Sequence, residues 1–245
     1  MEDKALLSTE VASGAEKAEL LIVIPAYNEA ENIERVVNHL TANFPQYDYV
    51  VVNDGSRDET AAIRQRNGYN LLNLPVNLGL AGAFQAGLKY ADKYGYQYAV
   101  QLDGDGQHRP EYLESMIKKM EEGYDIVIGS RFVGEKKPFT MRMLGSNLIE
   151  MAIRFTTGVN IKDPTSGMRM FSKRMIREFA SGLNYGPEPD TVSYLIRQGA
   201  RVAEVPVIMD ERILGVSYLT PVNAMRYMLK MLISILLIQN FRKRR

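Results

Sequence analysis

The sequence predicts an α/β fold in which helices flank a mostly parallel central sheet. Short apolar runs alternate with segments of helical periodicity, and the connections between them are short. The first run, Leu20–Ile24, contains no polar residue, which is typical of a strand buried on both faces of a parallel sheet. The chain has 245 residues, 46% of them hydrophobic, enough for one large domain with a buried core.

The first half of the chain shows the alternation most regularly. Its strands are rich in apolar residues, and its helices carry apolar residues at three- and four-residue spacing. After the first strand we expect, in order, a helix over 29–43, a strand over 49–52, a helix start after 56, a strand over 70–74, a helix reaching residue 93, a strand over 98–102, a helix over 110–121 and a strand over 125–128.

The pattern is looser after residue 132 but still predicts further helices and strands. We expect an amphipathic helix over 142–157, a turn at 163–169 that leads to a short strand, helices over 173–181 and 191–198, and a last strand over 202–209. Residues 1–19 are polar and lack periodicity, so we expect a mobile N-terminal segment before a main domain over 20–220.

Residues 221–245 predict a C-terminal amphipathic and basic helix. The uninterrupted apolar stretch, 231–238, is far shorter than the roughly 20 residues that span a bilayer. Arg226 and Lys230 precede this stretch and four basic residues at 242–245 follow it, which favours a helix lying on an anionic membrane surface. The alternatives are a helix packed on the domain with a solvated tail, or a Met-rich surface for a small membrane-protein partner.

Composition narrows the classes of partner and location. The net charge of +1 provides no global field for nucleic acid, so no nucleic-acid partner is expected. The absence of cysteine excludes disulfides and thiolate metal sites. With no signal peptide at the start, we expect a cytoplasmic protein.

Polar clusters follow three of the predicted strands, at residues 25–29, 53–56 and 103–107. Ligands of parallel sheets bind beyond the carboxyl ends of the strands, so we expect these clusters to lie side by side on one rim. Each cluster also has a simpler interpretation: Glu29 offsets a helix dipole, Asp54 caps a helix, and the Asp-x-Asp of the third cluster forms a turn or a helix cap.

The third cluster reads Asp103-Gly104-Asp105-Gly106-Gln107. Alternate residues point the same way, so the side chains of Asp103, Asp105 and Gln107 can converge. Such oxygen donors suit Mg²⁺ or Mn²⁺ with a substrate phosphate attached. A calcium loop is disfavoured, because His108 stands where that loop needs glycine and a strand precedes it instead of a helix.

Six motifs occur in an order that resembles the family 2 glycosyltransferases, most closely the branch of dolichol-phosphate mannose synthase and bacterial polyprenyl-phosphate glycosyltransferases. The motifs are Pro25–Glu29, Asn53–Ser56, Asn77–Gly79, Asp103–Gln107, Gly129–Arg131 and Ser166–Arg169. The resemblance covers about residues 20–220 and implies a GT-A fold, with inverting, metal-dependent sugar transfer from a nucleotide sugar.

The resemblance also implies roles for individual residues. The base and ribose would be held by Pro25, Tyr27, Glu29, Val52 and Asp54, and the sugar diphosphate would be lined by Asp103, Gly104 and Asp105. The metal would be held by Asp105 with Gln107 and Asp103, and Arg131 and Arg212 would lie against the phosphates or the acceptor. One departure is Tyr218, which stands where the mannose synthases carry a lysine.

The expected function is transfer of a sugar to undecaprenyl or dolichyl phosphate by a peripheral protein on the cytoplasmic membrane face. A lipid phosphate is already anionic and needs no general base, whereas a sugar hydroxyl needs one. Glu188 is the candidate catalytic base and Asp190 the second, although both also fit a proline-rich turn with capping acids. The rival functions are transfer to a lipid-linked or cell-wall glycan hydroxyl, nucleotidyl transfer, and a non-catalytic nucleotide-sugar-binding scaffold.

Overall fold

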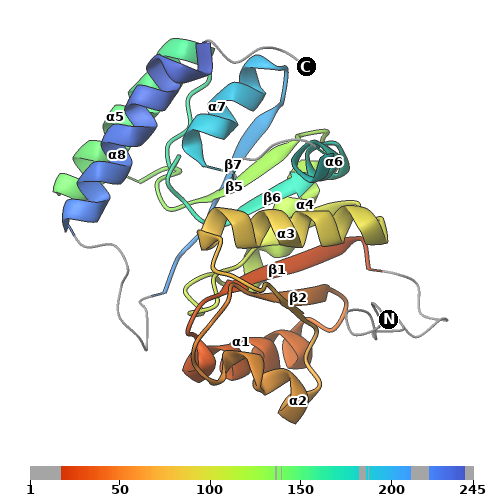
Figure 1. The fold of residues 1–245 in the computed structure, drawn as a ribbon. Helices are drawn as coiled ribbons and strands as arrows, with labels where there is room; N and C mark the ends of the chain where they lie inside the picture. The colour runs from red at the N-terminus through yellow and green to blue at the C-terminus, as the bar shows by residue number, and fades with distance from the viewer. Residues whose placement is uncertain are drawn as a thin grey trace.

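The computed structural model describes residues 18–135, 137–138, 140–181, 186, 188–210 and 221–240. These residues contain a seven-stranded sheet in the order β3-β2-β1-β4-β6-β5-β7 (Figure 1). The strands are β1 (Leu20–Ala26), β2 (Asp48–Asn53), β3 (Leu71–Asn73), β4 (Tyr98–Gln101), β5 (Ile126–Ser130), β6 (Arg169–Ser172) and β7 (Val202–Pro206). β6 runs antiparallel to β4 and β5, while the other neighbouring pairs are parallel. The expected mostly parallel sheet is therefore confirmed.

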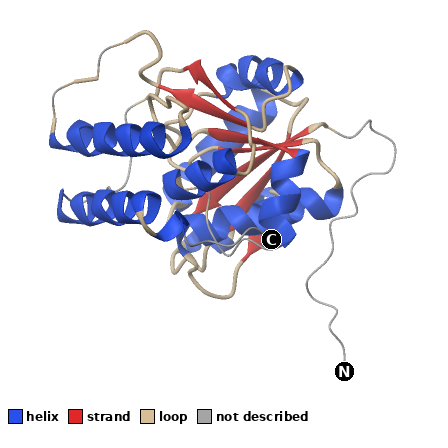
Figure 2. Cartoon of the chain, turned by 90° about the horizontal axis from the view of Figure 1, so that it is seen from above, coloured by secondary structure: helices blue, strands red, loops and turns tan. Residues whose placement is uncertain are grey.

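Helices cover both faces of this sheet (Figure 2). They are α1 (Ala30–Asn43), α2 (Ile63–Asn67), α3 (Gly79–Tyr94), α4 (Leu113–Glu121), α5 (Met141–Thr157), α6 (Lys173–Ser181), α7 (Pro189–Arg197) and α8 (Pro221–Leu236), with short 3-10 turns η1 (Glu59–Ala61), η2 (Pro110–Tyr112) and η3 (Ile238–Asn240). One hydrophobic cluster joins the sheet to α3, α5, α6, α7 and α8, and the other joins it to α1, α2 and α4.

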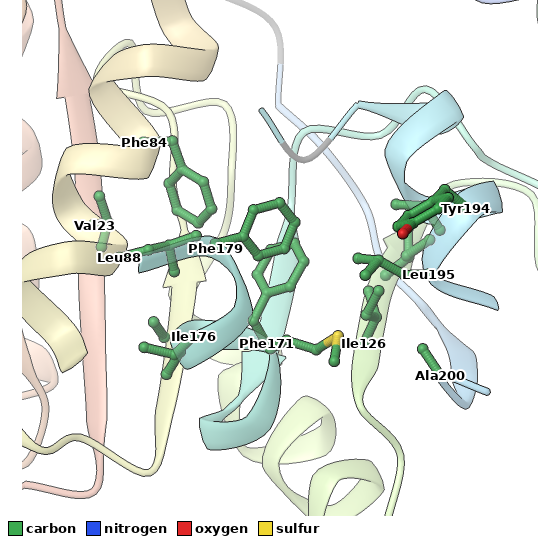
Figure 3. Close-up of a cluster of buried hydrophobic side chains, with 14 of the residues drawn as sticks. Val23, Phe84, Leu88, Ile126, Phe171, Ile176, Phe179, Tyr194, Leu195 and Ala200 are labelled. Atoms are coloured by element: carbon green, nitrogen blue, oxygen red, sulfur yellow. The ribbon is translucent and has the colours of Figure 1, made fainter. Parts of the chain in front are cut away.

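The position of β1 between the two hydrophobic clusters explains why its sequence contains no polar residue. Leu21 and Val23 point into the first cluster, whereas Leu20, Ile22 and Ile24 point into the second. Because successive strand residues face opposite sides, a strand covered on both faces must be apolar throughout. In the first cluster the ring of Phe171 packs against those of Phe84 and Phe179, with centroid distances of 5.8 Å and 5.4 Å respectively (Figure 3).

Two elements end earlier than the sequence predicts by more than a single residue. The last strand stops at Pro206 instead of residue 209, because its partner β5 ends at Ser130, opposite Pro206. The C-terminal helix, expected over 221–245, ends at Leu236 and is followed by the η3 turn. There the side chain of Gln239 turns inward to donate to Asp190, which draws the chain into the tighter turn.

α8 lies beside α5 and also contacts α7 (Figure 1). Met231 and Ile235 of α8 are buried in the first hydrophobic cluster. Among the described residues, no helix combines the length and apolar character needed to cross a membrane. The expected N-terminal segment, apart from Ala18 and Glu19, lies outside the described residues, and so do the basic residues 242–245.

The close packing of α3 on β1 predicts that a side chain at residue 87 lowers the stability of the protein. A Cβ atom on Gly87 would lie 2.2 Å from Cγ1 of Val23, and a β-branched side chain has little rotamer freedom to move away. Overpacking of this kind costs about 1–3 kcal/mol, of which about 0.5–1 kcal/mol is offset by the better helix propensity of alanine. We expect Gly87→Ala to lower the free energy of unfolding by about 1–2 kcal/mol in denaturant titrations.

The matched background is Val23→Ala, which removes the two methyl groups that meet the new Cβ. In that background Gly87→Ala should be neutral or stabilising. An equal loss of stability in both backgrounds would contradict the close contact as its cause.

Candidate active site

The loops after β1 and β2 are joined by hydrogen bonds. The backbone N–H of Asn28 donates to Oγ of Ser56 at 3.0 Å, and the N–H of Arg57 donates to Oδ1 of Asn28 at 2.9 Å. The N–H of Glu29 donates to Oγ1 of Thr60 at 3.2 Å. The first two polar clusters therefore lie side by side, as the parallel sheet predicts.

Asp54 joins the loop after β2 to the start of α3. Its carboxylate is buried and accepts the N–H of Leu78 at 2.6 Å, while its own N–H donates to the carbonyl of Ala26. Gly55 has φ of +65°, and a Cβ there would lie 2.8 Å from the backbone N of Asn77. The expected helix cap is therefore wrong for Asp54: Asp58 caps the 3-10 turn that follows, and Asp54 instead binds the residue before α3, 24 positions away.

The third polar cluster lies against the first. A Cβ on Gly104 would lie 3.0 Å from the carbonyl oxygen of Pro25, so only glycine allows this approach without displacement. The Nη2 of Arg35, on α1, donates to the carbonyl of Asp105 at 2.8 Å. All three expected clusters therefore occupy one rim of the sheet.

The Asp105 carboxylate is mostly buried within this rim. Its Oδ1 accepts the N–H of Gln107 at 3.0 Å, which closes a tight turn around Gly106, where φ is +81°. Asp103 lies at the head of the same turn, with Oδ1 accepting from Nε2 of Gln101 at 3.1 Å. Two carboxylates and an amide thus belong to one hydrogen-bonded loop.

The chain beyond β7 lies beside this loop. Nε2 of Gln107 donates to the carbonyl of Asp210 at 3.1 Å, and the N–H of Asp210 donates back to the carbonyl of Gln107 at 3.0 Å. Arg109 donates from Nε and Nη2 to the two carboxylate oxygens of Asp210. These hydrogen bonds hold the pKa of Asp210 below its ordinary value. Because Nε2 of Gln107 donates to the Asp210 carbonyl, the side-chain oxygen of Gln107 points away from that carbonyl.

Arg131 pairs with a residue that the sequence did not indicate. Its Nε and Nη2 donate to Oδ2 and Oδ1 of Asp163 at 2.7 and 2.9 Å, and the Asp163 side chain is 0% exposed. Arg131 was expected to face phosphates or the acceptor, but these two donors are occupied by Asp163. Asp163 was read only as part of a turn, and its separation of 32 residues left no local signal of the pairing.

The two candidate bases contact α8. Tyr227 donates to Oε2 of Glu188 at 2.5 Å, and Ser234 donates to Oδ2 of Asp190 at 2.6 Å. Burial raises the pKa of Tyr227, and the neighbouring carboxylate of Glu188 raises it further. A Cβ on Gly186 would lie 2.1 Å from that of Ala81, so this segment reaches the first turn of α3 at the rim.

The remaining candidate residues differ in position. Tyr27 is exposed next to the rim, whereas the side chain of Val52 is buried in the core and only its backbone lies near the rim. Arg212 and Tyr218 lie outside the described residues. Within the described ranges, no group of three or more Asp, Glu, His or Cys side chains is placed to hold a metal ion.

Comparison with known proteins identifies the family. Residues 21–179 match the model of Glycosyl transferase family 2. The chain belongs to glycosyl transferase family 2. Polyprenol monophosphomannose synthase of Mycolicibacterium smegmatis is 32% identical over 223 residues, which is 86% of this chain and 84% of that protein. Undecaprenyl-phosphate mannosyltransferase of Micrococcus luteus is 31% identical over 210 residues, covering 81% of this chain and 86% of its own.

The structural comparison confirms the GT-A fold. Glucosyl-3-phosphoglycerate synthase from Mycobacterium tuberculosis, crystallised with Mn²⁺, uridine-diphosphate-glucose and phosphoglyceric acid, has a TM-score of 0.67. The match covers 90% of this chain and 79% of that one at 18% identity. The family 2 assignment and the expected glycosyltransferase class agree with this fold.

The first rim loop of this family 2 member contains one residue in the left-handed region. Asn28 has φ of +55°, where a residue with a Cβ is disfavoured by about 1–2 kcal/mol unless it is Asn or Asp. Asn28→Gly and Asn28→Ala both lose the acceptor for the Arg57 N–H, so their difference isolates the backbone strain. We expect the Ala variant to be less stable than the Gly variant by up to about 1 kcal/mol in denaturant unfolding. Equal or reversed stabilities would contradict this conformation.

Proposed function

We propose that this protein transfers a sugar from a nucleotide diphosphate sugar to a polyprenyl phosphate, with inversion at the anomeric carbon. The observation that carries the proposal is the continuous polar rim formed by the loops after β1, β2 and β4, in a chain whose relatives are named for polyprenol and undecaprenyl phosphate. The chain covers more than four fifths of both relatives, and the family match over residues 21–179 contains all three loops.

We infer that Asp103, Asp105 and Gln107 would hold Mg²⁺ or Mn²⁺. Two carboxylates and one amide oxygen suit such a cation, because Mg²⁺ is commonly bound by one or two carboxylates together with substrate phosphates. This donor set fits although no larger acidic group occurs among the described residues. When bound, the ion would neutralise charge on the departing nucleoside diphosphate.

The nucleotide would lie across the first two loops. Glu29 and Asp54 would bind polar groups of the base and ribose, with Pro25 and the backbone at Val52 forming the floor. The exposed ring of Tyr27 offers a flat apolar surface for the base. Gly104 would let the diphosphate approach the backbone closely, since a side chain there would meet the carbonyl of Pro25.

The two candidate bases favour an anionic acceptor. Glu188 accepts a hydrogen bond from the hydroxyl of Tyr227, and Asp190 accepts one from Ser234, both on α8. A lipid phosphate needs no base to become a nucleophile, so a carboxylate held by α8 is compatible with it. Of the two candidate arginines, Arg212 would neutralise the phosphates, whereas Nε and Nη2 of Arg131 bind Asp163. Glu188 as a base for a hydroxyl acceptor stays a prediction.

We also propose that α5 and α8 together rest on an anionic membrane at the cytoplasmic face. Both helices expose large apolar residues at helical spacing on one side: Leu144, Leu148, Met151 and Phe155 on α5, and Met225, Leu229, Ile233 and Leu236 on α8. Phe155 is 86% exposed. Arg154, Arg226 and Lys230 are also exposed. Glu150, the one acidic residue of α5, pairs with Lys137 at 2.8 Å, and α8 contains no acidic residue. An apolar face rimmed by cations is typical of interfacial helices.

The transfer reaction is tested with radiolabelled nucleotide sugars and either undecaprenyl phosphate or a glycan acceptor, in Mg²⁺ or Mn²⁺. We expect label in the lipid phosphate product. Transfer to the glycan alone would contradict the proposed acceptor, and nucleotide-sugar binding without transfer to either would indicate a scaffold.

Asp105→Ala removes one carboxylate from the proposed cation site. We expect transfer to fall by about 10²–10³-fold, the loss typical of removing one group that stabilises developing charge, while the unfolding midpoint stays near that of the parent. Asp92→Asn, an exposed change at the far end of α3, is the control and should keep full activity. A folded Asp105→Ala protein with substantial transfer in saturating metal would contradict the assignment.

The membrane surface is tested by placing charge on α5. Met151→Glu combined with Phe155→Glu should weaken co-sedimentation with anionic vesicles at least about tenfold, because two apolar side chains no longer enter the interface. Lys89→Glu on α3 gives the same change of two charge units and should bind nearly as the parent does. Deletion of 241–245 should also weaken binding. Unchanged co-sedimentation of the double variant would overturn the assignment of this face.

A further inference from the structure

His108 lies behind the Asp103 carboxylate, in the interior of the domain. Its side chain is 2% exposed, whereas that of Asp103 is 32% exposed. We infer that His108 is a positioning residue, which fixes the orientation of the Asp103 carboxylate. The two side chains can lie against each other because Gly167 has no side chain to crowd them. The inference rests on the proposed function, because it takes Asp103 to be one of the groups that hold the divalent cation.

The hydrogen bond between these residues determines where the imidazole proton resides. The backbone N–H of Asp103 donates to Nδ1 of His108 at 3.1 Å, so Nδ1 must offer a lone pair. A neutral imidazole with an accepting Nδ1 carries its proton on Nε2. Nε2 lies 3.5 Å from Oδ2 of Asp103, an electrostatic contact longer than an ordinary hydrogen bond. One side chain thereby contacts both the backbone and the carboxylate of Asp103.

The second oxygen of Asp103 has a partner on the strand. Nε2 of Gln101, a buried residue of β4, donates to Oδ1 of Asp103 at 3.1 Å. Each carboxylate oxygen is therefore approached from the protein side by one neutral donor. A carboxylate oxygen accepts more than one hydrogen bond or ligand, so both oxygens keep lone pairs for a cation. Gln101 and His108 together restrict rotation of the carboxylate without neutralising its charge.

Gly167 provides the space for this arrangement. A Cβ there would lie 3.1 Å from Cε1 of His108 and 3.3 Å from Oδ2 of Asp103. The turn is held by Ser166, whose Oγ donates to the carbonyl of Gly129 at 2.5 Å and accepts the N–H of Met168 at 3.3 Å. The Ser-Gly pair, which entered the sequence analysis only as part of a family motif, thus has a physical reason: it seats His108 against Asp103.

The expected consequence is a change in metal affinity. Residues that orient a metal ligand commonly contribute 10- to 100-fold to affinity, because a freely rotating carboxylate must be ordered when the cation binds. The loss of metal affinity should be separable from a loss of stability, because amide side chains can replace the imidazole and preserve one of its two contacts.

The test measures binding of Mn²⁺ alone, from the electron paramagnetic resonance signal of free Mn²⁺, together with the unfolding midpoint. His108→Asn retains an acceptor near Nδ1 and loses Nε2, and we expect Mn²⁺ affinity to fall at least about tenfold. His108→Gln places an amide N–H near Nε2 and should recover part of the loss. Gly167→Ala should weaken binding as well, because its Cβ displaces the imidazole or the carboxylate.

His39→Asn is the matched control, since His39 is an exposed residue of α1 and the chain has 2 histidines. It should bind Mn²⁺ as the parent does. Folded His108→Asn protein with parental affinity would overturn the positioning role alone. A parent protein that binds no Mn²⁺ would overturn the proposed cation site and this inference with it.

A second measurement does not depend on variants at the site. In the His39→Asn protein the remaining imidazole belongs to His108, and its ¹⁵N spectrum, recorded without metal at a pH where the imidazole is neutral, should show the proton on Nε2. A proton on Nδ1 would overturn the inference, because that nitrogen could not then accept the Asp103 N–H.

Discussion

The site depends on the parallel pairing of β1 with its two neighbours. β1 pairs with β2 up to Ala26 and Asn53, and with β4 up to Val23 and Gln101, so three strands deliver their carboxyl ends to one rim. Apolar residues on both faces of β1 hold this register, since a shift by one residue would exchange the side chains of the two cores. The loops that begin at these strand ends place the residues proposed to bind the nucleotide and the cation: Tyr27, Glu29, Asp54, Asp103, Asp105 and Gln107.

The loops themselves are held by contacts between backbone and side chain. Asn28, Asp54 and Arg35 each use a side chain to bond the backbone of a neighbouring loop. Glycines at 104 and 167 allow approaches that a Cβ would crowd. The rim is therefore a network in which the residues proposed to bind a ligand are held in place by other polar residues. Such a network restricts the carboxylates before any substrate arrives.

The sequence predicted the sheet, the order of elements and the three rim clusters, because all of these follow from local hydrophobic pattern and from the rule for parallel strands. It did not predict that Asp163 would pair with Arg131, or that His108 would lie behind Asp103. Those contacts depend on tertiary placement, and neither a turn aspartate nor a buried histidine has a local signature. The early ends of β7 and α8 were missed for a similar reason: a strand needs a partner, and Gln239 bonds a residue far away in the chain.

The hydrogen bonds of Glu188 and Asp190 to α8 have a mechanical consequence. They join the segment that touches the first turn of α3 to the helix that carries the exposed apolar residues. A surface on which α8 rests would therefore set the height and tilt of the rim directly, through packed side chains instead of a tether. An acceptor whose reactive end projects a fixed distance from such a surface would meet the rim at one depth. The distance between the membrane surface and the rim would then be set by the fold itself.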